Sequence, residues 1–84
     1  MAETKVFNAE EIRRENIQYV INKVYEALQA KGYDPVIQIV GYLTTGDPAY
    51  ISSYNGARNL IQSVDRDEIL KEMVRSYLDD EEHE

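Results

Sequence analysis

The chain has no cysteine, a single histidine and no long apolar run. Without cysteine it forms neither disulfides nor thiolate metal sites, and one histidine falls short of the usual structural zinc ligand sets. No segment reaches the ~18 apolar residues of a membrane span, and the N-terminus lacks the apolar core of a signal peptide. These absences favour a cytoplasmic protein without a metal or a cofactor.

The length of 84 residues allows one small domain. A domain of this size buries only roughly 60–65% of its unfolded surface, so self-association is the natural way to stabilise it. The formal charge is −7, and five of the acidic side chains lie within residues 79–84. Removing those five charges from −7 leaves −2, without the basic face that nucleic-acid binding needs.

Residues 1–8 show no apolar periodicity, and we expect a flexible N-terminal arm there. Asn8 followed by Glu11 has the spacing of a capping box at a helix start. From residue 9 to about Ala30, apolar side chains recur at helical spacing and predict an amphipathic helix. These side chains are Ile12, Ile17, Val20, Ile21, Val24, Tyr25 and Leu28.

Two Asp-Pro pairs divide the middle of the chain. Asp supplies an N-cap oxygen, and the following Pro has the φ of a first helical residue. Asp34-Pro35 therefore predicts a second helix, which Gly46 ends because glycine adopts positive φ readily. Gly41 within it suggests a close backbone crossing, because glycine weakens a helix interior. This helix is apolar on nearly all sides, so we expect it to be covered on most of them, which favours a homodimer.

The rest of the chain predicts shorter elements and a second long helix. Asp47 opens a short helical turn, and residues 55–63 form another short helix. Asp65 with Glu68 again has capping-box spacing, at the start of the last helix. Its expected core stripe is Ile69, Leu70, Met73, Val74, Tyr77 and Leu78.

The predicted fold is an all-α, compact bundle of about five helices, two of them long, in a homodimer. We divide the chain into a flexible arm over residues 1–8, a helical domain over residues 9–78 and an acidic tail over residues 79–84. The tail is expected to fray, because acidic side chains at a helix C-terminus oppose the helix dipole.

No set of residues indicates catalysis. One cluster of carboxylates could hold a metal ion, although a capped helix start explains it more simply. It comprises Asp65, Asp67, Glu68 and Glu72, and it lacks the spacing of a calcium-binding EF-hand loop. The glycine-containing turns also lack the GxxxxGK[ST] phosphate loop. We therefore predict a protein that is not an enzyme.

Two functional alternatives remain open. The first is a helical nucleic-acid-associated module that uses Arg13, Arg14, Arg58 and Arg66, against which the mildly acidic body argues. The second is another kind of protein-interaction module.

Tyrosine is the abundant aromatic residue, with seven copies against one phenylalanine and no tryptophan. Half-buried packing with solvated hydroxyl groups is the simpler interpretation, but tyrosine is also enriched at protein interfaces. The candidate partner-binding residues are Asp47, Tyr50, Tyr54, Arg58 and Arg66.

The segments KGYDPVIQIVGYLTTGDPAYISSYNGARNLI and RDEILKEMVRSYL closely resemble the IreB family of Gram-positive regulatory phosphoproteins. The resemblance runs from Tyr25 to Leu78 and includes the arm segment ETKVF. The strings KGY-P, QIVGY, GDPAYI, AR and RDEI are specific to the family in combination.

This resemblance implies a small helical homodimer without catalytic activity. Family members are substrates of the membrane Ser/Thr kinase that carries extracellular PASTA repeats, and of its cognate phosphatase. They act in cell-envelope stress control and β-lactam tolerance. In part of the family they control proteolysis of the enzyme for the first committed step of peptidoglycan precursor synthesis.

The resemblance also implies a phosphorylation site at Thr4. The family's threonine precedes an aromatic residue by three positions, as Thr4 precedes Phe7 here. From the residues alone, an accessible threonine beside an acidic residue is a reasonable kinase target, although an ordinary polar residue is the simpler interpretation. A phosphate there adds about −1.5 to −2 charges, for which Arg58 and Arg66 are candidate partners.

The sequence departs from the family at two places where basic residues are expected, after GDPAYI and after the AR string. Neutral residues occupy them: Ser52, Ser53, Gln62 and Ser63. A partner interface that depends on this positive face is expected to be weaker or different in this protein.

Overall fold

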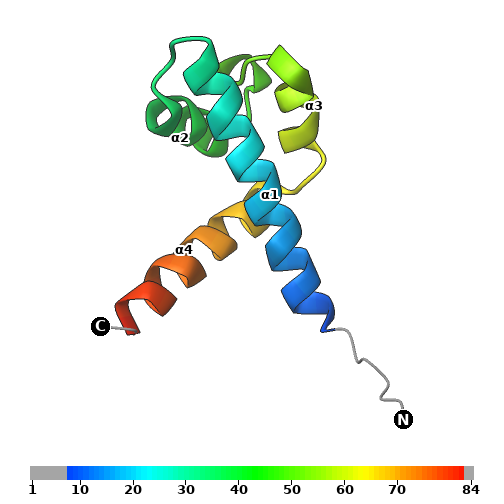
Figure 1. Cartoon of the computed structure of the whole chain (residues 1–84), viewed down its shortest axis with the longest axis vertical. Helices are drawn as coiled ribbons and strands as arrows, with labels where there is room; N and C mark the ends of the chain where they lie inside the picture. The colour runs from blue at the N-terminus through cyan, green and yellow to red at the C-terminus, as the bar shows by residue number, and fades with distance from the viewer. Residues whose placement is uncertain (1–7, 83–84) are drawn as a thin grey trace.

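The computed structural model describes residues 8–82, with side chains described up to residue 79, and every regular element in this part is helical (Figure 1). The all-α prediction is confirmed, whereas Thr4 lies outside the described residues. Instead of about five helices, residues 8–82 contain four α-helices and two short 3-10 helices. The elements are α1 (Ala9–Ala30), α2 (Pro35–Thr45), η1 (Pro48–Tyr50), η2 (Tyr54–Gly56), α3 (Ala57–Gln62) and α4 (Arg66–Glu82).

Three of the four predicted helix starts are formed by their capping side chains, whereas at the start of α4 the backbone carbonyl of Asp65, and not its side chain, accepts the hydrogen bonds. The Asn8 carboxamide oxygen accepts hydrogen bonds from the backbone N–H groups of the second and third residues of α1, at 3.0 and 3.3 Å. Asp34 caps α2 at the same two distances, and Asp47 caps η1 at 2.9 Å. At the other end of α2, Gly46 has φ +79°, a value that L side chains rarely adopt. The Asp-Pro and Gly signals thus set the bounds of α2.

The helix predicted over residues 55–63 is interrupted at its start. Asn55 has φ +53° and Gly56 has φ +72°, so the chain makes the turn η2 before α3 begins at Ala57. Asparagine and glycine are the residues that enter the left-handed region most readily. Tertiary packing selects this option, because Ala57 at the start of α3 is buried in the core.

The last helix ends later than the apolar pattern suggested. The pattern stops at Leu78, but α4 continues to Glu82. The Arg14 guanidinium on α1 lies 3.1 Å from the Asp79 carboxylate. This cation from a neighbouring helix offsets the unfavourable placement of an acidic residue near the helix C-terminus.

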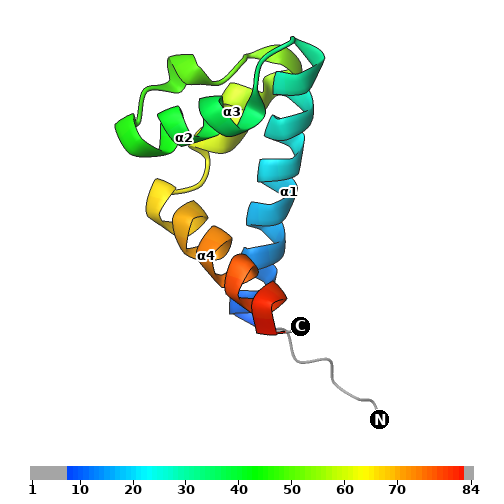
Figure 2. The ribbon, with the colours of Figure 1, turned by 90° about the vertical axis from the view of Figure 1, so that its left-hand side faces the viewer.

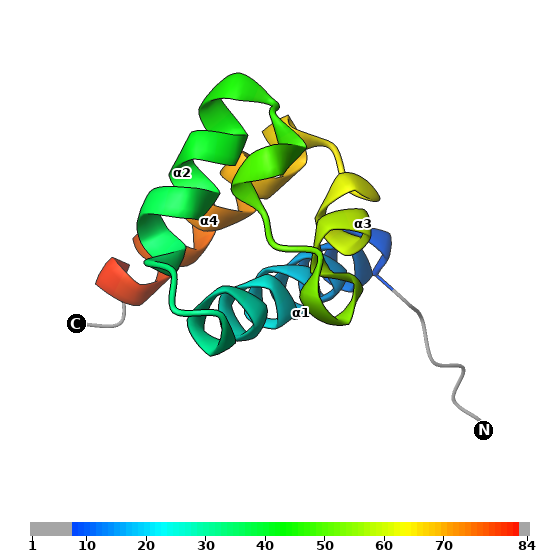
Figure 3. The ribbon, with the colours of Figure 1, turned by 90° about the horizontal axis from the view of Figure 1, so that it is seen from above.

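Helix α1 is the axis of the fold. In Figure 1, α2 and α3 flank its C-terminal half on opposite sides, while α4 departs near the middle of α1. Figure 1 shows α4 and the N-terminal half of α1 diverging from the point where they cross, Figure 2 shows α2 and α3 beside the C-terminal half of α1, and Figure 3 shows α4 passing underneath α2. The core residues of all four helices and the η1–η2 connection are Ile17, Val20, Val24, Ala27, Leu28, Ile39, Tyr42, Leu43, Ile51, Ala57, Ile61 and Ile69.

A single chain leaves much of its apolar surface exposed. On α2, the side chains of Val36, Ile37 and Val40 are 68%, 62% and 51% exposed, so the expected cover on most sides does not come from the chain itself. On α4, Ile69 is fully buried and Met73 is partly buried. The other members of its predicted core stripe are exposed: Leu70, Val74, Tyr77 and Leu78. One chain therefore buries only part of this stripe.

Candidate functional site

The five predicted partner-binding residues lie on the connection between α2 and α3 and on the helices that hold it. Asp47 caps η1, Tyr50 ends η1, and Tyr54 begins η2. Arg58 is in the first turn of α3, and Arg66 is the first residue of α4. Four of the five interact with the segment from α2 to η1, while the Tyr54 ring contacts another part of the same chain.

Arg58 and Arg66 hold this connection through its backbone. Arg58 Nε donates a hydrogen bond to the carbonyl oxygen of Ile51 at 2.8 Å, and Arg66 Nη1 donates to that of Leu43 at 3.0 Å. The Leu43 carbonyl is in the last turn of α2, where carbonyls have no partner within the helix. Arg66 therefore supplies the positive charge that this helix end favours and that α2 itself lacks.

Tyr50 is held against Gly41 of α2. A Cβ atom at Gly41 would lie 2.5 Å from the Tyr50 ring, so any side chain here would have to displace the ring. The Tyr50 carbonyl also accepts a hydrogen bond of 3.0 Å from the Gln38 side chain. The close approach predicted at Gly41 is thus made by an aromatic ring rather than by a crossing backbone.

Tyr54 faces the C-terminal end of α1. The Lys31 ammonium lies 5.3 Å from the centroid of the Tyr54 ring, within the range of a cation–π interaction. No hydrogen bond or cation–π contact joins the Tyr54 side chain to the other four residues within the described part of the chain. The five residues therefore make two neighbouring features rather than a single cluster.

The two arginines differ in their electrostatic surroundings. Neither forms an ion pair with any carboxylate described here, so each keeps donors for a ligand. Arg66, however, lines a surface hollow together with Asp65 and Asp67. Arg58 therefore presents the less compensated charge, and it is the better placed of the two for an anionic partner.

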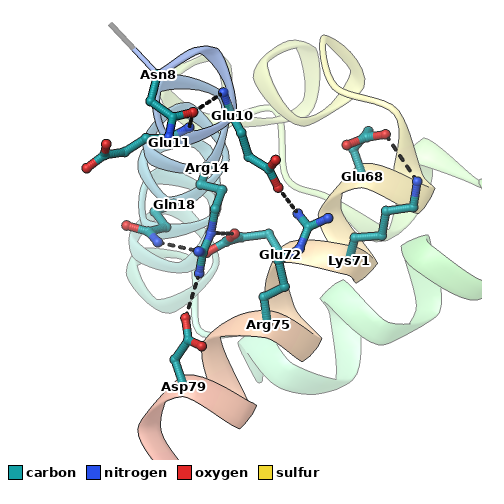
Figure 4. A network of polar contacts seen from close by, with 10 residues as sticks. All are labelled: Asn8, Glu10, Glu11, Arg14, Gln18, Glu68, Lys71, Glu72, Arg75 and Asp79. Carbon is teal, nitrogen blue, oxygen red and sulfur yellow. Dashed lines mark hydrogen bonds and ion pairs between the residues drawn. The ribbon is translucent and has the colours of Figure 1, made fainter. Parts of the chain in front are cut away.

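The structure contains a polar cluster that the sequence did not predict as a unit (Figure 4). The Glu72 carboxylate on α4 is 3% exposed and accepts hydrogen bonds from Arg14 Nε at 2.5 Å and Gln18 Nε2 at 2.7 Å. Arg14 also binds Asp79, and Arg75 lies 3.3 Å from Glu10 in the first turn of α1. These contacts join the N-terminal half of α1 to α4, and we call them the α1–α4 clasp.

The clasp sets the ionisation of Glu72. Burial alone would raise the pKa of this carboxyl, but hydrogen bonds from Arg14 and Gln18 outweigh burial, with further help from the charge of Arg75. The pKa of Glu72 consequently lies below its ordinary value, and the same hydrogen bond raises the pKa of Arg14. Glu72 is therefore charged in the folded protein at neutral pH.

This shift predicts a pH dependence of stability. Because the pKa of Glu72 is lower in the folded than in the unfolded protein, its contribution is complete above the ordinary value of 4.5 and disappears as the pH falls through the folded value. The difference in unfolding free energy between the wild type and Glu72→Gln should be constant from pH 7 to about pH 5 and shrink below that range. Urea denaturation at several pH values measures it.

Glu68→Gln is the matched control for this measurement, because it makes the same substitution in α4 at a carboxylate that pairs with the exposed Lys71. A difference between the wild type and Glu72→Gln that stays the same from pH 7 to pH 3 would contradict the assignment of Glu72 as a charged member of the clasp.

The residues of the clasp carried a weak sequence signal. Arg14 and Gln18 are four residues apart and Glu72 and Asp79 seven apart, so each pair lies on one helical face. Neither spacing shows which face meets the other. Sequence reasoning instead grouped Glu72 with the carboxylates at the start of α4, whereas the structure turns it towards α1.

The metal-binding and nucleic-acid-binding interpretations of the charged residues can be compared with the contacts that these residues make. Among the side chains of residues 8–79, no group of three or more acidic, histidine or cysteine residues is arranged to hold a metal ion. Three of the four arginines considered for nucleic-acid binding are engaged within the chain: Arg14 by carboxylates, and Arg58 and Arg66 by backbone carbonyls. None of the helices in this part of the chain combines the length and apolar character that spanning a bilayer requires.

Fold and surface together define a small helical protein with exposed apolar and tyrosine-containing faces, as is typical of protein-interaction modules. Residues 2–79 match the family model described as IreB regulatory phosphoprotein. The chain belongs to this family of regulatory phosphoproteins. Its membership confirms the resemblance found in the sequence and implies protein partners.

Proposed function

We propose that this protein is a non-enzymatic phosphorylation switch, a cytoplasmic substrate of a membrane PASTA-type Ser/Thr kinase and its cognate phosphatase. The supporting observation is the family match, which begins at residue 2 and so includes the position of Thr4. The switch controls peptidoglycan synthesis and β-lactam tolerance through regulated proteolysis of a peptidoglycan-precursor enzyme. This role follows from the family resemblance and requires no catalytic group in the chain itself.

Thr4 is the proposed phosphorylation site, four residues before the N-cap of α1. The arginines that the structure fixes near this end of α1 are Arg14 and Arg75, through Asp79 and Glu10 respectively. Each already has a carboxylate partner, so a phosphate at Thr4 has to compete with carboxylates that are in place. We therefore propose that phosphorylation acts mainly by changing what the arm binds, with the helical domain kept intact.

The proposed partner surface is formed by Asp47, Tyr50, Tyr54, Arg58 and Arg66. Asp47 and the two arginines hold the η1 connection in one shape, which presents Tyr50 and Tyr54 with 37% and 44% exposure. A rigid aromatic surface loses little conformational entropy on binding, so it suits a protein partner. The neutral residues Ser52 and Ser53 between them make this surface less basic than in the family pattern.

A homodimer is part of the same proposal. An apolar face extends over α2 and α4, where Val36, Val40, Leu70, Val74 and Tyr77 are exposed. A hollow between α1, α2 and α4 adjoins this face. Nine residues line it, and all of them except Asn22 and Tyr25 have purely apolar side chains. Contiguous apolar surface of this kind marks an association site. A second copy of the chain supplies the cover that α2 lacks.

The function is tested first at Thr4. We expect incubation with the cognate kinase to add one phosphate to the wild-type protein and none to Thr4→Ala, as read by intact-protein mass spectrometry. Thr44→Ala is the control, because Thr44 is exposed but donates its hydroxyl to backbone carbonyls of α2. Equal phosphate uptake by the wild type and Thr4→Ala would remove Thr4 as the site and, with it, the proposed switch.

A further inference from the structure

A second groove lies on the other side of α1, away from the apolar face. Its floor consists of small or partly buried side chains, Ala27 and Ala30 of α1 and Leu60 of α3. Tyr19, Lys23 and Glu26 border it on α1, and Tyr54 and Asn55 border it on η2. Tyr54 also belongs to the proposed partner surface, whereas the proposed phosphorylation and the proposed dimer do not use this groove.

Two tyrosine rings that line the groove each lie under a lysine, of which Lys23 lines the groove and Lys31 lies at its edge. Lys23 Nζ lies 5.7 Å from the centroid of Tyr19, and Lys31 Nζ lies 5.3 Å from that of Tyr54. These contacts hold the ammonium groups at the aromatic walls without using up their hydrogen-bond donors. The groove therefore has aromatic walls that carry positive charge and an apolar floor between them.

The lysine charges are only weakly compensated. The one carboxylate near Lys23 is that of Glu26 at 4.0 Å, and both side chains of this pair are at least half exposed. Lys31 forms no ion pair with the side chains described up to residue 79. Glu26 also lines the groove, so Lys23, Lys31 and Glu26 together leave one positive charge along it. In a chain of net charge −7, this local positive charge attracts anionic groups.

The η2 rim is held in an uncommon conformation. Asn55, with φ +53°, is the single non-glycine residue of positive φ among residues 8–82. Such backbone is costly and persists where the surrounding structure enforces it, often at binding sites. Here the turn follows Tyr54, whose ring contacts Lys31. The side-chain carboxamide of Asn55 forms no hydrogen bond with the described groups, so it is available to a ligand.

The dimensions of the groove select a peptide pattern. Lys23 and Lys31 are eight residues apart on one stripe of α1 and its C-cap, a separation of about 12 Å at ~1.5 Å per residue. An extended peptide advances ~3.3 Å per residue and points alternate side chains to one face. Residues i and i+4 of such a peptide therefore reach the two ammonium groups, and residue i+2 faces the alanine floor.

We propose that this groove binds an acidic segment of a partner protein with the pattern acidic–x–apolar–x–acidic. The inference rests on the proposed function only in that a regulatory protein acts through protein partners. The two outer carboxylates bind Lys23 and Lys31, and the central apolar side chain rests on Ala27 and Ala30. The backbone of the segment lies alongside the Asn55 amide.

The test uses the unphosphorylated full-length protein and a fluorescein-labelled peptide, Ser-Glu-Ser-Leu-Ser-Glu-Ser, with fluorescence anisotropy as the readout. We expect Lys23→Gln and Lys31→Gln each to weaken binding about two- to fivefold, as for exposed charge pairs. Ala30→Glu, at an exposed position, should weaken it more than tenfold, because it blocks the floor and repels the peptide. Lys71→Gln removes an equal charge on α4 and should leave binding unchanged.

A control peptide and an oligonucleotide distinguish the possible outcomes of this test. A peptide of equal composition with adjacent glutamates, Ser-Ser-Glu-Glu-Leu-Ser-Ser, should bind more weakly, because it cannot reach both lysines. Absence of binding up to millimolar peptide, equal loss in Lys71→Gln, or tighter binding of a single-stranded oligonucleotide of equal charge would each overturn the proposal. Because no kinase is involved, failure at Thr4 leaves this result intact, and failure here leaves the Thr4 result intact.

Discussion

Glutamate in place of both Val40 and Val74 is expected to separate the proposed dimer into monomers. Both valines are more than half exposed in the single chain, on the apolar face of α2 and α4. Full burial of a valine contributes about 1.5 kcal/mol, so burying the exposed half of four valines in a dimer contributes about 3 kcal/mol. Their loss raises the dissociation constant by about two powers of ten, before any cost of burying the new carboxylates.

Sedimentation equilibrium at micromolar concentration measures this change. Ile12→Glu is the matched control, because Ile12 is 48% exposed on the stripe of α1 that carries Tyr19, away from the apolar face. It should leave the dimer unchanged. A wild-type protein that sediments as a monomer at these concentrations would remove the dimer from the proposal. A dimer that only Ile12→Glu disrupts would place the interface on the stripe of α1 that carries Ile12.

Replacing Ile69 with alanine is expected to remove a large share of the total stability. Ile69 is the one α4 side chain, among those described, that is fully buried in the core. Removing a buried isoleucine to alanine costs about 2–5 kcal/mol, because the cavity left behind does not close fully. At about 0.05–0.15 kcal/mol per residue, a domain of this length has only about 4–13 kcal/mol in all.

Urea denaturation of Ile69→Ala and Ile12→Ala, at equal protein concentration, tests this prediction. The two variants lose the same atoms, but from a side chain that is 0% exposed in one case and 48% exposed in the other. The midpoint should fall markedly for Ile69→Ala and little for Ile12→Ala. Equal losses would mean that α4 is not anchored through Ile69, and equal concentration keeps the dimer equilibrium from biasing the comparison.

Local signals in the sequence were sufficient for the helices near their caps. Asn8, Asp34 and Asp47 cap the elements they were predicted to start, and Gly46 ends α2 in a left-handed conformation. These features depend on neighbours two or three residues away, so the residue types alone determine them. The break at Asn55 was missed because a left-handed asparagine is an option that only packing selects.

Contacts between distant residues were beyond the same reasoning. The apolar positions of α4 predict a single buried face, yet Ile69 is buried and Leu70 and Val74 are exposed. Arg58 and Arg66 were expected to face a partner or a phosphate, and both also donate to backbone carbonyls of the α2–α3 connection. Which face of a helix meets another depends on the crossing of the helices, and periodicity does not encode it.

By itself, the sequence determined the helical class, the family and the helix starts, because each depends on local residue types or on a string of them. The tertiary structure decided that Glu72 binds Arg14, that Tyr50 covers Gly41 and that Lys31 meets Tyr54. Such contacts join residues nine to 58 positions apart. They arise only when α1 packs between its neighbours, since that packing alone fixes which side chains share a surface.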